Sequence, residues 1–318
     1  MDLREPHLIL GVGELLWDML PEGPRLGGAP ANFTVMAGRL GDHAAILSRV
    51  GRDELGRSAM ELLYPLPVDS GHVQIDARHD TGRVTVELKS GQPSFTIHEP
   101  AAWDFLELSD EWLQLAERAS AICFGSLAQR SSISRQTVQT LVAETPETCV
   151  RVFDVNLRAP FYSAEIVQES LGLATVMKMN DAEVPLVLSL LDLDRNQNTD
   201  RKLDTGGAKD LLRLGAQRLL REFPGLKMAA VTRGGNGSLL VTREGCDEHS
   251  GVAVKIADTI GAGDAFTAAM THYLLRGASL ATLNEAGNRW GGWMASQSGA
   301  MPELPDETRA EIASAIER

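Results

Sequence analysis

The sequence predicts an α/β fold in which a doubly wound, mostly parallel sheet is flanked by helices. Short aliphatic runs recur along the 318 residues, and longer amphipathic stretches separate them. Hydrophobic residues make up 43% of the chain but aromatic residues only 5%, a balance that suits strands buried on both faces. A chain of this length often forms one large α/β unit with a modest appendage, so we expect a single domain over residues 1–318.

The expected strands are apolar runs without helical spacing, at residues 8–12, 44–50, 121–124, 150–155, 174–177 and 228–231. The expected helices carry apolar residues three and four positions apart, at residues 31–40, 55–63, 110–118, 134–142, 181–190, 207–221, 263–275 and 280–296. Strands and helices alternate through most of the chain. This alternation is typical of parallel strands joined by helical crossovers.

Residues 83–88 and 94–98 break the alternation, because no helix separates them. Both runs are rich in Val, Thr, Phe or Ile, and they flank Ser90-Gly91, so they predict a hairpin. Together with 15–20 they are expected to form a small β-sheet lid, made of residues 15–26 and 81–100. The unpaired edges of such a sheet also predict a homodimer through the lid. The polar segment 192–205 is expected to be a surface insertion.

The composition argues against several classes of function. A formal net charge of −13 disfavours a broad basic surface for nucleic acid or an anionic membrane. The start of the chain lacks a basic stretch followed by a long apolar run, so neither a signal peptide nor a membrane span is expected. Cys123, Cys149 and Cys246 are widely separated and odd in number, which favours buried thiols in a reducing cytoplasm. The seven histidines show no pair at metal-ligand spacing.

The strongest motif is Asp-Thr-Ile-Gly-Ala-Gly-Asp-Ala-Phe at residues 258–266. Gly261, Ala262 and Gly263 directly precede an expected helix, where backbone N–H groups can close around an anion. Asp264 lies in the first turn, where its carboxylate could accept a hydroxyl proton beside a transferring phosphoryl group. A tight turn followed by a capping aspartate explains the same spacing equally well.

A second motif, Gly-Gly-Ala-Pro-Ala-Asn at residues 27–32, leads into an expected helix. Gly27 and Gly28 let the backbone approach a ligand closely, and Asn32 can both donate and accept hydrogen bonds. Upstream, the carboxylate of Asp18 could accept hydrogen bonds from two hydroxyl groups of a polyol. Without a ligand, residues 27–32 would be an ordinary helix start and Asp18 an exposed carboxylate at a strand end.

Polar residues also follow two of the expected strands. Arg158 comes after 150–155, and Asn180 and Glu183 come after 174–177. Ligands of parallel α/β sheets gather beyond the carboxyl ends of the strands, so both groups could face one crevice. For Glu183 an ordinary carboxylate in the first turn of a helix is the alternative. The chain has neither the third glycine of a dinucleotide-binding loop nor a GxxxxGK[ST] phosphate loop.

These motifs, spread from Gly11 to about Ala300, resemble those of the ribokinase-like (PfkB-type) carbohydrate kinases. The resemblance implies that Asp264 is the catalytic base and that Gly261, Ala262 and Gly263 form the anion hole. The residues that it assigns to the sugar are Asp18, Gly27, Gly28, Asn32 and Arg158. Those that it assigns to the nucleotide are Asn180, Glu183, Thr232, Gly234 and Asn288. Glu183 is also expected to act on Mg²⁺ through water.

The resemblance implies ATP with Mg²⁺ and a small sugar as the ligands, and it also implies a K⁺ site formed with the backbone at Thr259 and Ile260. Residues 153–158 and 161–163, with the motif at 27–32, look most like those of fructokinases. Ribokinase and 2-keto-3-deoxygluconate kinase remain close alternatives, because the residues that select the sugar lie in the lid. A nucleoside kinase fits less well. A catalytically silent sugar-binding homologue is the alternative from another class, and the retention of Asp264 with its glycines argues against it.

Overall fold

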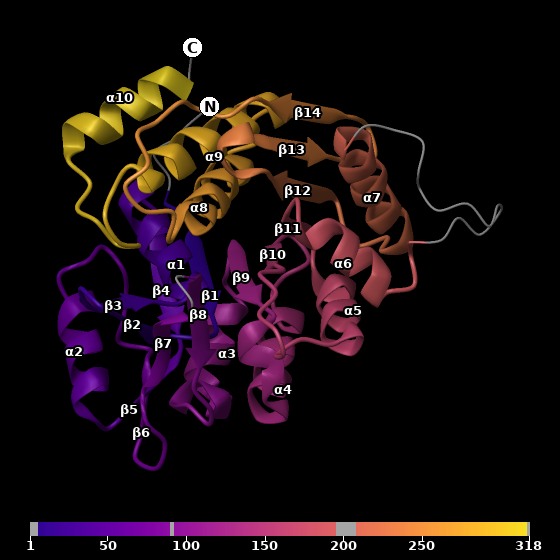
Figure 1. The fold of residues 1–318 in the computed structure, drawn as a ribbon. Coiled ribbons are helices and arrows are strands. Elements are labelled where there is room, and N and C mark those ends of the chain that lie inside the picture. Colours follow the sequence, from indigo (N-terminus) through magenta and orange to yellow (C-terminus); the bar gives the residue numbers. More distant parts are fainter. Residues whose placement is uncertain (1–5, 90–91, 195–207, 317–318) are drawn as a thin grey trace.

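The structure is a computed structural model that describes residues 6–89, 92–194 and 208–316, and its core is an eight-stranded sheet (Figure 1). The strand order is β14-β13-β12-β11-β10-β9-β1-β4. The parallel strands are β1 (Leu8–Val12), β4 (His43–Leu47), β9 (Ala121–Gly125), β10 (Val150–Asp154), β11 (Val176–Asn180) and β12 (Met228–Thr232). At one edge, β13 (Ser238–Val241) and β14 (Cys246–His249) run antiparallel. The predicted mostly parallel sheet is confirmed.

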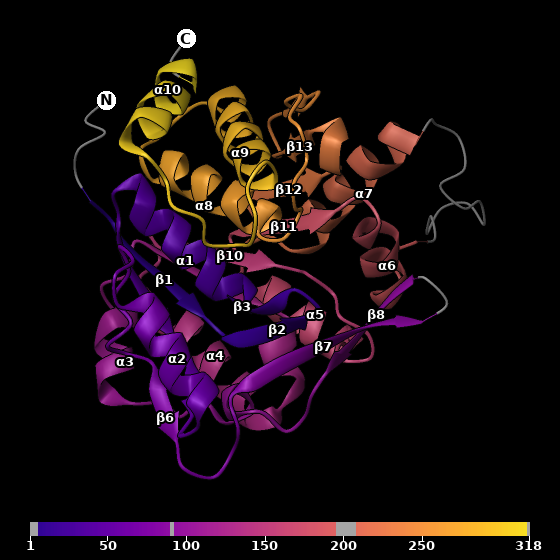
Figure 2. The same ribbon diagram turned by 60° about the vertical axis from the view of Figure 1, so that its left-hand side comes forward.

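Helices cover both faces of this sheet, as Figures 1 and 2 show. One layer contains α3 (Asp110–Ala116), α4 (Ser132–Ala143), α5 (Ala164–Leu173), α6 (Glu183–Leu190) and α7 (Ala208–Glu222). The other contains α1 (Ala29–Leu40), α8 (Ala262–Leu275) and α9 (Leu280–Ala295), with α10 (Asp306–Ile316) against α9. Each layer packs on the sheet through its own cluster of buried aliphatic side chains. The strands are apolar on both faces because both faces are covered.

A second, four-stranded sheet has the order β3-β2-β7-β8. It is formed by β2 (Leu16–Leu20), β3 (Gly23–Gly27), β7 (Gly82–Lys89) and β8 (Gln92–Ile97), and only the β2–β7 pair is parallel. We call it the small sheet. It corresponds to the predicted lid, although the predicted turn Ser90-Gly91 lies outside the described residues. Trp17 and Leu26 of the small sheet pack with residues of α1 and of α2 (Glu54–Leu63) in a third hydrophobic cluster.

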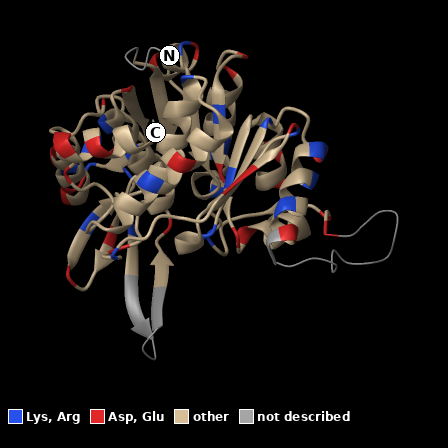
Figure 3. Cartoon of the chain, turned by 90° about the horizontal axis from the view of Figure 1, so that it is seen from above, with Lys and Arg blue, Asp and Glu red and all other residues tan. Residues whose placement is uncertain are grey.

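Basic and acidic residues are interspersed along the helices in Figure 3. Within the residues that the structure describes, no helix has the length and apolar character needed to cross a membrane. Cys123 and Cys149 are buried, as predicted. The prediction for Cys246 was wrong, because this residue begins the edge strand β14 and is exposed.

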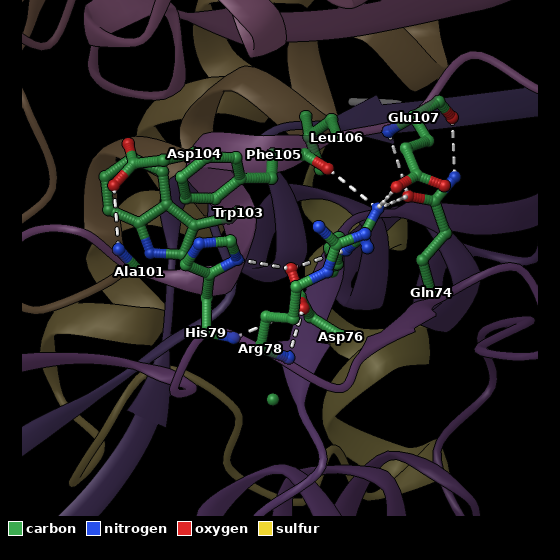
Figure 4. Close-up of polar contacts among 12 residues, drawn as sticks. Gln74, Asp76, Arg78, His79, Ala101, Trp103, Asp104, Phe105, Leu106 and Glu107 are labelled. Carbon is green, nitrogen blue, oxygen red and sulfur yellow. Dashed lines mark hydrogen bonds and ion pairs between the residues drawn. The ribbon is translucent and has the colours of Figure 1, made fainter.

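A polar cluster surrounds Asp76 in the segment that leads into β7 of the small sheet (Figure 4). Asp76, at the end of β6 (Gln74–Asp76), accepts the backbone N–H groups of Arg78 and His79 at 2.7 and 3.2 Å. Arg49 of β5 (Arg49–Gly51) pairs with Asp76 at 3.1 Å and donates to the carbonyl oxygen of Phe105 at 2.8 Å. Burial alone would raise the pKa of Asp76, but these donors and the Arg49 charge lower it to about 2. The cluster therefore keeps the buried carboxyl group of Asp76 ionised.

Several boundaries differ from the sequence predictions. The expected strand 44–50 is two strands, because β4 ends at Leu47 and β5 pairs with β6 in a separate two-stranded sheet. Ser48 lies between them, and its hydroxyl donates to the carbonyl oxygen of Gly13 at 2.6 Å. The sequence did not predict α5 or α10. Most of the expected insertion 192–205 lies outside the described residues. Short 3-10 turns occur at Ala102–Phe105, Leu127–Arg130 and Gly234–Asn236.

Candidate active site

Asp264 and Asn32 meet in the structure. Asp264 lies in the first turn of α8 and Asn32 in the first turn of α1, and the two helices pack against each other. Asn32 Nδ2 donates a hydrogen bond to Asp264 Oδ2 at 2.8 Å, across 232 residues of sequence. The two strongest motifs of the sequence, at 27–32 and 258–266, are thus in direct contact.

The two glycines before Asp264 lie close to neighbouring groups, and Gly261 also has a backbone conformation that favours glycine. Gly261 is the N-cap of α8 with a left-handed φ of 77°, and no side chain caps the helix there. A Cβ built on Gly261 would lie 3.0 Å from Ala300, and one on Gly263 would lie 2.9 Å from Lys178 Nζ. An uncapped helix start with its N–H groups and positive dipole end is a suitable place for an anion.

Lys178, which the sequence analysis passed over, places a buried positive charge beside Gly263. Its Nζ lies 3.0 and 3.1 Å from the carboxylate oxygens of Asp154, its register partner on the neighbouring strand. Burial by itself would lower the pKa of Lys178, but the negative charges of Asp154, Asp264 and Glu183 raise it above its ordinary value. The ammonium group is therefore charged at neutral pH. A lysine directly after the apolar run 174–177 was the available signal.

The environment of Asp264 raises its basicity. Burial raises its pKa to about 6, and the negative charge of Asp154 acts in the same direction. The charge of Lys178 and the hydrogen bond from Asn32 act in the opposite direction. A carboxylate with a pKa near 6 is a better proton acceptor than an ordinary aspartate and is still ionised at pH 7.

A second buried carboxyl group, Glu14, also escaped the sequence analysis. It is 4% exposed and lies near enough to Asp264 for the two charges to interact. Glu14 Oε1 accepts the backbone N–H of Ala29 at 3.2 Å, whereas Oε2 is buried without a partner in the part of the chain that the structure describes. Burial raises the pKa of Glu14 to about 7. Asn32 Oδ1 is likewise buried and unpaired among the described residues, so two oxygens are left to accept hydrogen bonds from a ligand.

The residues predicted to bind a sugar gather around these carboxyl groups. A Cβ on Gly27 would lie 3.1 Å from Asp18 Oδ2, and a Cβ on Gly28, whose φ is 118°, would collide with the carbonyl oxygen of Glu14. Burial raises the pKa of Asp18, and the charge of Arg158 opposes this. Arg158 is exposed, and its charge also acts on Glu14 and Asp264. The charge of Arg158 therefore opposes the rise that burial causes in the pKa of three carboxyl groups, those of Glu14, Asp18 and Asp264.

Glu183 organises two loops at the strand ends. Its carboxylate oxygens accept the backbone N–H groups of Leu157 and Asn180, each at 2.8 Å. Asn180 Oδ1 in turn accepts the backbone N–H of Glu183 at 2.9 Å. Both oxygens of Glu183 are thus occupied by protein donors, and each keeps one further acceptor direction. This arrangement suits a contact with a hydrated Mg²⁺ through water better than a direct bond to the metal.

The residues predicted to bind the nucleotide are less closely grouped. Thr232 ends β12, and Gly234 follows it in an exposed turn with a left-handed φ of 55°. Space around Gly234 is open, since a built Cβ would meet no atom within 4 Å. Asn288 is buried on α9, and its Nδ2 donates to Ser238 Oγ at 2.6 Å and to the carbonyl oxygen of Asn284 at 2.8 Å. Its amide nitrogen therefore links α9 to β13.

Comparison with known proteins places the chain in one family. Residues 24–307 match the pfkB family of carbohydrate kinases, and the chain belongs to that family. It is 29% identical to the fructokinase of Escherichia coli, over 92% of this chain and 95% of that protein. The protein is accordingly an ATP-dependent carbohydrate kinase with a ribokinase-like fold.

Two crystal structures are similar over almost the whole chain. An uncharacterized sugar kinase of Pyrococcus horikoshii gives a TM-score of 0.77 at 28% identity, covering 96% of this chain and 97% of that one. The fructokinase of Vibrio cholerae, solved with fructose, ADP and calcium ion, gives a TM-score of 0.78 at 26% identity, covering 98% and 99%. The Pyrococcus kinase has also been solved with ATP, and a variant of the Vibrio enzyme with potassium ion.

Proposed function

We propose that this kinase transfers the γ-phosphoryl group of ATP to a hydroxymethyl group of a small neutral sugar, and that this sugar is fructose. The observation that carries the proposal is the 2.8 Å hydrogen bond from Asn32 Nδ2 to Asp264 Oδ2. It joins the segment that resembles a sugar-binding loop to the carboxylate at the start of α8. A sugar bound there would present a hydroxyl group to the base beside the anion hole.

The residues of the site support the following reaction. Asp264 accepts the proton of the sugar hydroxyl group. At the same time the hydroxyl oxygen of the sugar bonds to the γ-phosphorus, and the bond from that phosphorus to ADP breaks. Backbone N–H groups at Gly261–Gly263 and the charge of Lys178 stabilise the negative charge on the transferring group. Mg²⁺ carried by ATP would neutralise phosphate charge, and Glu183 would hold it through water.

The carboxyl groups favour an uncharged sugar. Glu14, Asp18 and Asp264 line the side predicted to hold it, with Arg158 as the nearby cation. The unpaired oxygens of Glu14 and Asn32 can accept hydrogen bonds from the hydroxyl groups of a neutral sugar and of a sugar acid alike, so the discrimination against a sugar acid rests on charge. A sugar acid such as 2-keto-3-deoxygluconate would bring a further negative charge to this set. Fructose and ribose both meet the requirement, and the similarity to fructokinases favours fructose.

The test is an assay of ADP release with MgATP and a panel of fructose, ribose and 2-keto-3-deoxygluconate. We expect the largest kcat/KM for fructose, and an Asp264→Asn variant that keeps its fold but loses about 10²–10⁴-fold in kcat, the usual contribution of a general base. Preference for the sugar acid would refute the neutral-sugar assignment. Sugar binding by calorimetry without turnover would identify a silent homologue instead.

A further inference from the structure

An ion pair joins the small sheet to the loop that precedes Asp264. Arg25 Nη1 lies 2.8 Å from Asp258 Oδ2, across 233 residues of sequence. Asp258 also accepts the backbone N–H groups of Ile260 at 3.0 Å and of Gly299 at 3.3 Å. One carboxylate therefore connects β3, the loop at 258–261 and the loop that follows α9.

The same carboxylate organises the backbone around Gly261. Its bond to Ile260 N–H shapes the turn that leads directly into Gly261. A Cβ on Gly261 would lie 3.0 Å from Ala300, the residue after Gly299, so the two loops that Asp258 holds are in contact. A negative charge next to backbone that receives phosphate oxygens is unfavourable unless a cation neutralises it. Arg25 supplies a cation at Asp258.

Arg25 also belongs to the sugar side of the site. In the antiparallel β2–β3 pair it lies directly opposite Asp18, so both side chains project from the same face of the small sheet. Burial raises the pKa of Asp18, and the charge of Asp258 adds to this effect. Arg25 therefore pairs with the carboxylate of Asp258, which shapes the anion-hole loop, and stands directly opposite the strand position of Asp18, which is assigned to the sugar.

We propose that Arg25 is a positioning residue for phosphoryl transfer, which ties the sugar-holding strand to the anion-hole loop and supplies the fixed positive charge at Asp258. The proposal rests on the sugar kinase function proposed above. A sugar seated against β2 and β3 then sets the position of the anion-hole loop through this contact. Phosphoryl transfer depends strongly on such alignment, because a displacement of about 1 Å can lower the rate by about 100-fold.

The test compares Arg25→Ala and Arg25→Lys with Arg83→Ala as a matched control. Arg83 is an exposed arginine on β7, which pairs with the other side of β2, and its register partner is Trp17 instead of Asp18, so it projects from the opposite face. For Arg25→Ala we expect a loss of about 10- to 100-fold in kcat. The melting temperature should hardly change, because partly exposed ion pairs contribute little to stability.

Chemical rescue separates positioning from a purely structural role. Low, non-denaturing concentrations of guanidinium chloride should restore part of the turnover of Arg25→Ala and should not raise that of wild type or Arg83→Ala. Arg25→Lys should retain more activity than Arg25→Ala. Combining Arg25→Ala with Asp258→Asn should cost little more than either change alone, because the two groups act together. Wild-type kcat in Arg25→Ala, or additive losses without rescue, would overturn the proposal.

Two further measurements test whether Arg25 or a metal ion supplies the charge, and whether Arg25 affects ATP binding in the absence of turnover. In contrast to the K⁺ site expected at Thr259 and Ile260, we expect that replacing K⁺ by tetramethylammonium leaves wild-type kcat unchanged. An equal fall in wild type and in Arg25→Ala would show that a metal ion supplies the charge instead of Arg25. Titration with a non-hydrolysable ATP analogue gives a readout that does not need turnover. We expect about tenfold weaker binding in Arg25→Ala than in wild type, and equal binding would count against the contact. If wild type phosphorylates no sugar, the proposed function fails, and this titration still tests Arg25.

Discussion

Replacing Asp154 by Asn should shift the pH dependence of turnover to lower pH. Asp264 must be ionised to accept a proton, and burial followed by the charge of Asp154 raises its pKa to about 6. From this pKa, Asp264 would be about nine-tenths ionised at pH 7 and about one-tenth ionised at pH 5. We therefore expect wild-type kcat/KM for the sugar to be about tenfold lower at pH 5 than on its plateau.

Both consequences of the Asp154→Asn change lower the pKa of Asp264. The change removes a negative charge that raises this pKa, and it frees Lys178, whose ammonium group Asp154 holds at 3.0 and 3.1 Å, to interact with Asp264. A nearby opposite charge lowers a carboxyl pKa by about one unit or more. At pH 5 the variant should then show about half of its own plateau value.

The assay is the pH profile of kcat/KM between pH 4.5 and about 8.5, normalised to the plateau of each variant, with the melting temperature recorded at each pH. The control is Asp154→Asn combined with Lys178→Met, which removes both charges and leaves burial to set the pKa of Asp264. Its acid limb should return toward that of wild type. An acid limb of Asp154→Asn that stays in place or moves to higher pH would refute this account of Asp264.

Four other substitutions test separate parts of the site. Gly263→Val should abolish most turnover and weaken ATP binding, because a Cβ there already lies 2.9 Å from Lys178 Nζ; unchanged ATP affinity and kcat would contradict this placement. Asp18→Ala and Asn32→Ala should lower kcat/KM for the sugar by about 10- to 100-fold, which corresponds to the loss of a hydrogen bond to a charged group. ATP affinity should stay nearly the same. Equal losses for both substrates would show that these residues do not belong to the sugar part of the site. Glu14→Gln should remove any inflection near pH 7 from the pH profile of KM for the sugar, since the pKa of Glu14 is raised to about 7; a retained inflection would assign it to another group.

The sequence was informative about features that depend on local pattern. The apolar runs predicted the parallel strands because both faces of those strands are covered, and such runs need no tertiary information to recognise. The position of Gly261 before a helix followed from the two glycines and the apolar helix after them. The prediction of a single strand at 44–50 was wrong for a reason that lies in the tertiary structure. The hydroxyl group of Ser48 donates a hydrogen bond to the distant residue Gly13, and the chain leaves the large sheet there.

The sequence was uninformative about charges that gain meaning only by pairing across the fold. Lys178 is buried because its register partner Asp154 neutralises it, and the register of β10 and β11 is a property of the assembled sheet. Glu14 is buried because the start of α1, with Gly28 against it, closes over the loop after β1. Neither carries a motif of its own, so each would have been placed on the surface by composition alone.

These pairings explain how a chain with a net charge of −13 can accommodate ATP. Charges in solvent are screened over about 8 Å at physiological ionic strength, so the acidic exterior has little influence on a bound phosphate. The field at Gly261–Gly263 is set instead by the nearest groups, which are the start of α8, Lys178 and Asp264 itself. Under the proposed function, the carboxyl groups would bind the sugar and provide the base, whereas the buried ammonium group would stabilise the phosphate. Lys178 is held in place by Asp154 and kept charged by the surrounding carboxylates. The acidic residues that bring negative charge to the site therefore also keep its buried ammonium group protonated.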